Sequence, residues 1–285
     1  MKKIILLVLI FLFLAFPSLA WAANLSWSWK SISPIPIKTT DNELNIDAKS
    51  IIVFDWETGA VLYEKNPDYT QPIASITKLM TAVILLENYS KKDMITVSYR
   101  AANTTGSIMG LVTDEQITVS DIVKGLMVMS ANDAAIAVED QYSQSKIIDQ
   151  MNQKAKDLEL PNTKYFDAIG FDEKNVSSAE ELYFLSYYAM QKPEIQQTAD
   201  TIEEALVSAS GQEHILMTTN RLLKNYPDIF GIKTGFTDEA GSCLIAGAEQ
   251  NGNKIVSVLL GSPNYDQRFT DSRTILDWIY ENYKW

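Results

Sequence analysis

The chain has 285 residues, of which 46% are hydrophobic, and its formal net charge is −12. This composition can supply a full hydrophobic core and is unlike that of disordered, collagen-like or multi-span membrane proteins. The excess of acidic residues argues against nucleic acid as a partner. One cysteine, Cys243, and one histidine, His214, exclude an internal disulfide and are too few for a zinc site, so we expect no metal and no cofactor. We expect Cys243 to be a buried hydrophobic residue and His214 to lie at the surface or at a strand edge.

The N-terminus has the features of a secretory signal. Lys2 and Lys3 precede an apolar run over 4–16, and Ala20-Trp21-Ala22 places small residues where a signal peptidase cleaves. The run is shorter than a bilayer span, although a retained membrane anchor is the alternative. We therefore expect residues 1–22 to be a signal peptide. The protein would then be exported to the periplasm, the cell-wall space or the medium, or stay tethered to the membrane if the signal is not cleaved.

Residues 23–46 are expected to form a linker, because their prolines remove hydrogen-bond donors and fix φ. One folded domain over 47–285 is expected to follow. The chain stops at Trp285, soon after its last expected helix, so we expect neither a further domain nor a C-terminal anchor.

The expected elements change in kind along the chain. A hairpin over 50–56 and 60–64 turns at Glu57-Thr58-Gly59, and a strongly apolar helix begins at Ser75. Four more helices follow, one capped by Ser120 or Asp121: 122–129, a helix after Asn132, 145–158 and 178–191. The last third contains three strands and a final helix, with a two-residue turn at Asn251-Gly252: 229–236, 242–249, 254–260 and 265–283. This order predicts an α+β fold in which an antiparallel sheet is flanked by helices, with an additional helical lobe.

Three short motifs occur in order and in distinct contexts: Ser75-Ile76-Thr77-Lys78, Ser130-Ala131-Asn132 and Lys233-Thr234-Gly235. The first begins the buried helix, the second follows a helix, and the third lies in a strand. Ser143 also begins an S-x-x-K match, but it lies on a polar connector, and Ser262 begins an S-x-N match after the third motif. Context therefore selects Ser75 over Ser143 as the nucleophile.

The spacing of the first motif suits nucleophilic catalysis. Residues i and i+3 share a helix face, so Lys78 can reach the hydroxyl of Ser75. A serine hydroxyl needs a base, and lysine can serve if burial and a nearby positive charge, such as Lys233, favour its neutral form. The N–H groups of Ser75 and Phe236 could form an oxyanion hole.

These motifs resemble those of class A β-lactamases and penicillin-binding proteins. The sequence is most similar to the low-molecular-mass D-alanyl-D-alanine carboxypeptidases, and the resemblance runs from Ile51 to Trp278. It implies a β-lactamase/DD-peptidase-like fold. It also implies a serine carboxypeptidase of peptidoglycan biosynthesis that removes the terminal D-Ala from stem peptides ending in D-Ala-D-Ala. β-Lactam antibiotics would acylate it, and we expect a monomer.

The resemblance also implies a role for each motif residue. Ser75 would form the acyl-enzyme, Lys78 would be the general base, and Ser130 would relay a proton to the leaving amine. Asn132 would hold the substrate amide or the lysines. Lys233 and Thr234 would face the terminal carboxylate, and Arg268 would also pair with it. Gly235 and Phe236 of the third motif region would bind substrate as well. The alternative for Arg268 is a surface ion pair with Asp266 or Asp271.

Two departures and two alternatives remain. The family often has a His-aromatic-Ser-Thr stretch where this chain has Asn175-Val176-Ser177-Ser178, and often has His where this chain has Phe236. A class A-like β-lactamase would need a deacylating glutamate. The acids of the loop over 161–177, Asp167, Asp172 and Glu173, do not form the Glu-x-x-Leu-Asn pattern. The other alternative is a non-catalytic cell-wall-binding protein of the same fold.

Overall fold

The structure is a computed structural model, and it describes residues 34–40 and 42–285. The expected signal peptide (1–22) and residues 23–33 of the expected linker lie outside these residues. Within the rest of that expected linker, Ile37–Lys38 (β1) pairs antiparallel with Tyr283–Lys284 (β13). No helix among the described residues is long and apolar enough to cross a membrane.

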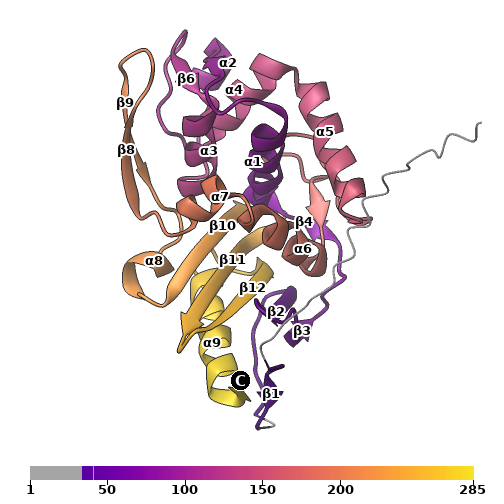
Figure 1. Ribbon diagram of the computed structural model, residues 1–285. Coiled ribbons are helices and arrows are strands. Elements are labelled where there is room, and N and C mark those ends of the chain that lie inside the picture. The colour runs from indigo at the N-terminus through magenta and orange to yellow at the C-terminus, as the bar shows by residue number, and fades with distance from the viewer. Residues whose placement is uncertain (1–33, 41) are drawn as a thin grey trace, which may run out of the picture. The chain divides into compact units, whose positions relative to one another are not determined.

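A five-stranded antiparallel sheet joins the two ends of the described chain. Its strand order is β10-β11-β12-β2-β3 (Figure 1). The strands are Ile229–Thr237 (β10), Gly241–Gln250 (β11), Asn253–Ser262 (β12), Ser50–Asp55 (β2) and Val61–Lys65 (β3). The expected hairpin β2–β3 is confirmed, and β2 also pairs antiparallel with β12, so strands from both ends of the chain share the sheet. The β11–β12 turn places Asn251 at φ 54° and Gly252 at φ 80°, which is the left-handed geometry of a two-residue hairpin turn.

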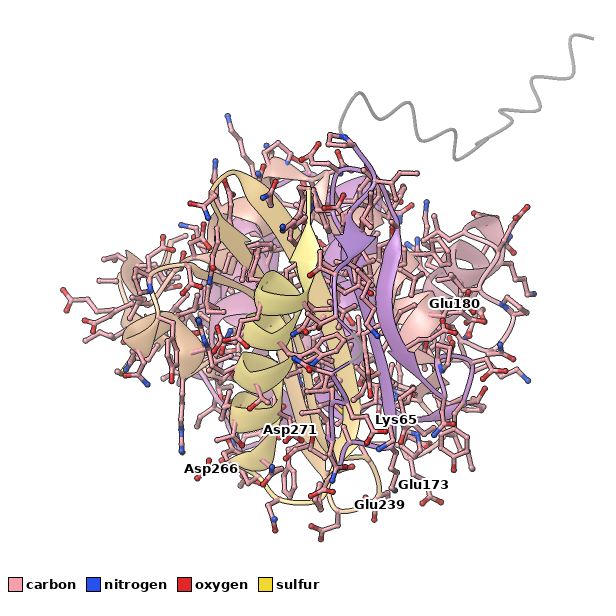
Figure 2. The ribbon with its side chains drawn as sticks, turned by 90° about the horizontal axis from the view of Figure 1, so that it is seen from below. Lys65, Glu173, Glu180, Glu239, Asp266 and Asp271 are labelled. Atoms are coloured by element: carbon pink, nitrogen blue, oxygen red, sulfur yellow. The ribbon has the colours of Figure 1, made fainter. Side chains whose placement is uncertain are left out.

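Helices cover both faces of this sheet. Gln267–Asn282 (α9) packs Ile275 and Ile279 against one face, in a core that also contains Val53. The ring of Phe54, the next residue of β2, contacts Tyr183 of Ala179–Met190 (α6). Adjacent strand residues point to opposite faces, so α6 covers the other side and β2 is buried throughout. Figure 2 shows α9 lying along the sheet, with the labelled Asp266 and Asp271 near one end of the helix.

A helical lobe surrounds Thr77–Asn88 (α1), whose first nine residues are all buried. Around α1 lie Val119–Val128 (α3), Asn132–Tyr142 (α4), Gln144–Asp157 (α5), α6 and Pro193–Ala199 (α7) (Figure 1). The remaining elements are short: Gln71–Pro72 (β4), Ala74–Ile76 (η1), Met94–Thr96 (β5), Tyr99–Ala102 (α2), Gln116–Thr118 (β6), Val176–Ser177 (β7), Glu203–Val207 (β8), Glu213–Met217 (β9) and Leu222–Asn225 (α8).

The structure corrects two local expectations. The expected cap of the helix over 122–129 is wrong, because α3 begins three residues earlier and Thr118 is its N-cap. The Thr118 hydroxyl accepts the N–H of Asp121 at 3.1 Å. The strongly apolar helix begins at Thr77, and Ser75 lies just before it in the single 3₁₀ turn η1. Ser75 therefore lies before the first turn of α1 and is half-buried, so its hydroxyl stays accessible.

Candidate active site

Ser75 and Lys78 meet at the start of α1. The residue before Ser75, Ala74, adopts a left-handed φ of 47°, which turns the chain sharply into η1. Lys78 lies one helical turn later, and its Nζ is 2.8 Å from the Ser75 Oγ. A serine hydroxyl and a lysine amine are therefore within hydrogen-bonding distance, which is the arrangement that nucleophilic acyl transfer needs.

The Lys78 amine joins three parts of the chain. It is fully buried and contacts the Ser75 Oγ, the Asn132 Oδ1 at 2.9 Å and the Ile169 carbonyl oxygen at 2.7 Å. Burial lowers the pKa of Lys78 from 10.5 to about 7, against the opposing charges of Asp167 and Asp133. The main cause is therefore loss of hydration, and a large fraction of the amine is neutral near pH 7.

The second motif lies between α3 and α4. Ser130 has a left-handed φ of 60° and is 5% exposed, and Asn132 opens α4. Asn132 donates its Nδ2–H to the Thr105 carbonyl at 2.8 Å and its backbone N–H to the Ser107 carbonyl at 2.7 Å. A Cβ at Gly106, which has φ +93°, would lie 2.7 Å from the Asn132 Nδ2. Only glycine therefore allows this loop to lie so close to the asparagine.

The third motif lies on β10 directly beside η1. A Cβ on Gly235 would be 2.9 Å from the Ile73 carbonyl oxygen, so a side chain there would separate the strand from the turn that carries Ser75. Lys233 is buried and donates to the Thr234 carbonyl at 2.9 Å, while the Thr234 hydroxyl bonds the Thr219 hydroxyl at 2.6 Å. Burial, with the charges of Lys78 and Arg268, holds the pKa of Lys233 well below its ordinary value.

Arg268 does not form the surface ion pair that was the alternative expectation. Its side chain is 1% exposed, donates from Nη1 to the Gly235 carbonyl at 2.7 Å and lies 4.2 Å from the ring centre of Tyr265. Asp266 pairs instead with Arg221. The guanidinium therefore lies behind the third motif and fixes its backbone.

Phe236 forms part of an exposed aromatic rim. Its side chain is 43% exposed, and its ring meets that of Tyr265 edge-to-face with centroids 5.3 Å apart. The departure from histidine therefore places an apolar ring next to the third motif, on the solvent side.

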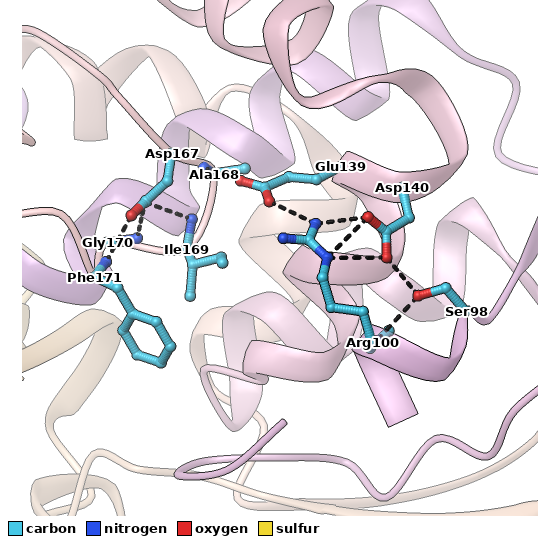
Figure 3. A network of polar contacts seen from close by, with 10 residues as sticks. Ser98, Arg100, Glu139, Asp140, Asp167, Ala168, Ile169, Gly170 and Phe171 are labelled. Carbon is cyan, nitrogen blue, oxygen red and sulfur yellow. Dashed lines mark hydrogen bonds and ion pairs between the residues drawn. The ribbon is translucent and has the colours of Figure 1, made fainter. Parts of the chain in front are cut away.

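Sequence reasoning missed the role of Asp167. Its buried carboxylate accepts the backbone N–H groups of the next turn, from Ile169, Gly170 and Phe171 at 2.9, 2.5 and 3.0 Å (Figure 3). It also accepts the N–H of Asp172 at 2.7 Å and the Asn175 Nδ2–H at 2.8 Å. This turn supplies the carbonyl that contacts Lys78. The available signal was an aspartate three residues before a glycine in a loop, a pattern typical of side-chain-stabilised turns.

The same loop bears on the β-lactamase alternative. The oxygens of Asp167 are occupied by N–H donors, Asp172 accepts the N–H of Lys174 at 2.9 Å, and Glu173 is exposed. None of these hydrogen bonds joins a loop carboxylate to Ser75 or Lys78. The loop acids do not form the Glu-x-x-Leu-Asn pattern, and the buried acid among them, Asp167, has a structural role.

The single cysteine and the single histidine are both buried. Cys243 lies fully buried on β11, as expected. His214 does lie on an edge strand, since β9 pairs only with β8 among the described residues, but the surface alternative is wrong, because it is 4% exposed and bonds the buried Glu115 at 2.6 Å. The hairpin β8–β9, which carries it, packs its inner face against the molecule.

Comparisons with known proteins agree with this geometry. The family model described as D-alanyl-D-alanine carboxypeptidase matches residues 37–264. D-alanyl-D-alanine carboxypeptidase DacF of Bacillus subtilis is 32% identical over 251 residues, which are 85% of this chain and 64% of that protein. A D-alanyl-D-alanine endopeptidase of Pseudomonas aeruginosa is 33% identical over 257 residues, 87% of this chain and 82% of that protein. The chain thus spans less than two thirds of the length of DacF.

Solved structures share the fold. The DD-transpeptidase of Streptomyces K15 has a TM-score of 0.78 and 26% identity, covering 84% of this chain and 99% of that one. Penicillin-binding protein D2 of Listeria monocytogenes, in its ampicillin-bound form, has a TM-score of 0.73 and 30% identity, covering 84% and 100%. The motifs, their geometry and these matches agree: the chain belongs to the D-alanyl-D-alanine carboxypeptidase family of serine peptidases and has the β-lactamase-like fold of the penicillin-binding proteins.

Proposed function

We propose that the protein is a serine D-alanyl-D-alanine carboxypeptidase that removes the terminal D-Ala from peptidoglycan stem peptides through an acyl-enzyme on Ser75. The observation that carries this proposal is the contact of 2.8 Å between the Ser75 Oγ and a buried lysine amine. The pKa of that amine is about 7, so the base is available at neutral pH.

The reaction begins with attack of the Ser75 Oγ on the penultimate D-Ala carbonyl, while Lys78 takes the hydroxyl proton. The N–H groups of Ser75 and Phe236 stabilise the oxyanion, because η1 and β10 lie side by side. Ser130 passes a proton to the amine as the C–N bond breaks and D-Ala leaves. Water then hydrolyses the ester, with Lys78 again taking a proton.

The positive groups behind the third motif bind the terminal carboxylate of the substrate. Lys233 and Thr234 face it, and Arg268 adds charge while holding Gly235 in place. The Arg268 Nε has no hydrogen-bond partner among the described residues. A bound carboxylate brings the opposite charge and would raise the lowered pKa of Lys233, so binding favours the protonated amine.

The proposal also includes the domain organisation, the export of the protein and its reaction with β-lactams. Residues 47–285 would form one monomeric catalytic domain, exported by the signal peptide over 1–22 to build the cell wall outside the cytoplasm. β-Lactams would acylate Ser75 as structural mimics of D-Ala-D-Ala, and the ampicillin-bound relative supports this ligand class. The non-catalytic alternative would not need a base positioned at the nucleophile.

Two incubations of the purified protein test the proposal. A fluorescent penicillin should label it durably, and a peptide ending in D-Ala-D-Ala should lose D-Ala. Rapid turnover of the penicillin would indicate a β-lactamase, and the absence of both reactions would indicate a binding protein. Relatives named as endopeptidases make a cross-linked stem peptide the second substrate to test. If Ser75→Ala still releases D-Ala at the full rate, Ser75 is not the nucleophile.

A further inference from the structure

His214 and Glu115 form a buried pair that the proposed mechanism does not use. His214 lies on β9 and Glu115 just before β6, and the two are 4% and 2% exposed. The His214 Nδ1 is 3.0 Å from the Met109 carbonyl oxygen, and its Nε2 is 2.6 Å from the Glu115 Oε1. The other oxygen of Glu115 accepts the N–H of Val112 at 2.9 Å.

The partners of the imidazole fix its protons. A carbonyl oxygen can only accept, so the His214 Nδ1 is a donor. A proton must also lie between the His214 Nε2 and the Glu115 Oε1, because two lone pairs 2.6 Å apart would repel. The pair is neutral overall and fully hydrogen-bonded, which is how a buried polar pair avoids a large desolvation cost.

The segment that this pair holds also supports the second motif. We call residues 105–115 the supporting segment. Beyond the two carbonyls that bond Asn132, its backbone N–H groups of 109, 110 and 111 donate to the Asp133 carboxylate at 3.1, 2.9 and 3.0 Å. Met109 therefore donates its N–H to Asp133 and accepts from His214 through its carbonyl. One residue links the buried histidine to the start of α4.

The hairpin β8–β9 also connects to the third motif. Two residues after β9 ends, Thr219 bonds the Thr234 hydroxyl at 2.6 Å. At the hairpin turn, the Ser210 hydroxyl accepts the N–H of Gln116 at 2.7 Å, in an exposed contact. The buried His214 contacts are the ones that reach the part of the supporting segment next to Asn132.

We propose that His214 is a positioning residue: with Glu115 it anchors the supporting segment and so keeps Asn132 against the Lys78 amine. This inference rests on the proposed function, in which Lys78 is the base. Small displacements of a group that contacts the base are costly, because acyl transfer depends on sub-ångström placement.

A variant series separates hydrogen bonding from packing. His214→Leu removes both contacts, while His214→Asn retains a donor near Met109 and His214→Gln retains one near Glu115. Glu115→Gln keeps every contact, because its carbonyl can accept the Val112 N–H and its amide can donate to a neutral His214 Nε2. The control Arg273→Leu breaks the pairs with Asp228 and Asp277 at the far end of β10, and should affect stability alone.

The rate of acylation by fluorescent penicillin, measured over a range of penicillin concentrations, separates the maximal rate constant from the binding of penicillin. We expect His214→Leu to lower the maximal acylation rate constant by about 10- to 100-fold, while the half-saturating penicillin concentration changes little. Glu115→Gln and Arg273→Leu should acylate like the wild type. The maximal rate constants of His214→Asn and His214→Gln should lie between those of His214→Leu and the wild type. These two variants replace His214→Leu in the test if it does not fold.

Amide hydrogen exchange tests the anchoring without using activity. In the His214 variants the amides of 109–111 and of Asn132 should exchange faster, while those of the five-stranded sheet keep their protection. If the wild type is not acylated at all, the proposed function fails and the exchange result still tests the anchoring. Unchanged exchange at these amides, wild-type acylation by His214→Leu, or a loss in Glu115→Gln equal to that in His214→Leu would each overturn the proposal.

Discussion

The pH dependence of acylation is the most direct test of the site, because it depends on the burial of one amine. In the proposed mechanism, Lys78 must be neutral to take the proton of Ser75. With its pKa lowered to about 7, half of the amine is neutral at pH 7. At its ordinary pKa of 10.5 only about one amine in 3,000 would be neutral at that pH. Burial therefore increases the available base by about a thousandfold.

The sign of the effect follows from the lowered pKa. The neutral form grows as the pH rises, so the maximal acylation rate should fall about tenfold per pH unit below pH 6 and level off above pH 8. The same burial penalises the charged amine in the folded state. The pKa falls from 10.5 to about 7, so this penalty grows as the pH decreases through that range and reaches at most about 5 kcal/mol.

The assay is fluorescent-penicillin labelling between pH 5 and 10, with saturating ligand so that the rate reports the bound complex. Lys78→Met should lower the plateau rate above pH 8 by about 10²- to 10⁴-fold, the usual contribution of a general base, and should remove the rising limb at lower pH. Lys154→Met, at a partly exposed lysine that pairs with Glu87 on the surface of the lobe, is the matched control and should keep both rate and profile. A rising limb with its midpoint above pH 9, or a Lys78→Met variant as fast as the wild type, would refute the role of burial.

Three further substitutions test the supports of the site. Asp167→Asn replaces a carboxylate that accepts five N–H groups, and should lower the unfolding free energy by about 2–3 kcal/mol and slow acylation, as thermal melts and labelling would show. Equal stability would mean that the loop does not need the charge. Gly170→Ala puts a Cβ 2.1 Å from the carbonyl that precedes the nucleophile and should slow acylation more than tenfold, whereas Gly211→Ala, with a similar φ but open space, should not. Thr118→Ala should cost about 1 kcal/mol in urea unfolding through loss of the α3 cap, and a larger loss in Ser120→Ala would contradict the cap assignment.

The local sequence pattern was sufficient to predict those helices, strands and turns whose formation depends on a single segment of the chain. Alternating and apolar runs located the β2–β3 hairpin, the β11–β12 turn and the long helices, because the hydrophobic period depends only on neighbouring residues. The hairpin β8–β9 was missed, since its outer face exposes Val207, Ile215 and Met217 and its pattern does not stand out. Whether such a strand pair forms depends on what its inner face meets, which no local window contains.

The candidate site shows the same division. The spacing of Ser75 and Lys78 alone predicted that the two side chains would meet, because three residues bring side chains to one face of a helical turn. The contact of Lys78 with Asn132 joins positions 54 residues apart. The alternatives for Arg268 could be separated only when α9 placed it behind Gly235.

The sequence by itself determined the spacing of Ser75 and Lys78 and the order of the three motifs, since these depend on residue type and position along the chain. Only the tertiary structure decided the environment of these residues. The fold buries Lys78 and so lowers its pKa. It also surrounds the Asp167 carboxylate with backbone N–H donors, and it buries His214 in a pair with Glu115. Burial is the sum of contacts from distant segments, so the pKa of a lysine and the exposure of a histidine are properties of the folded chain.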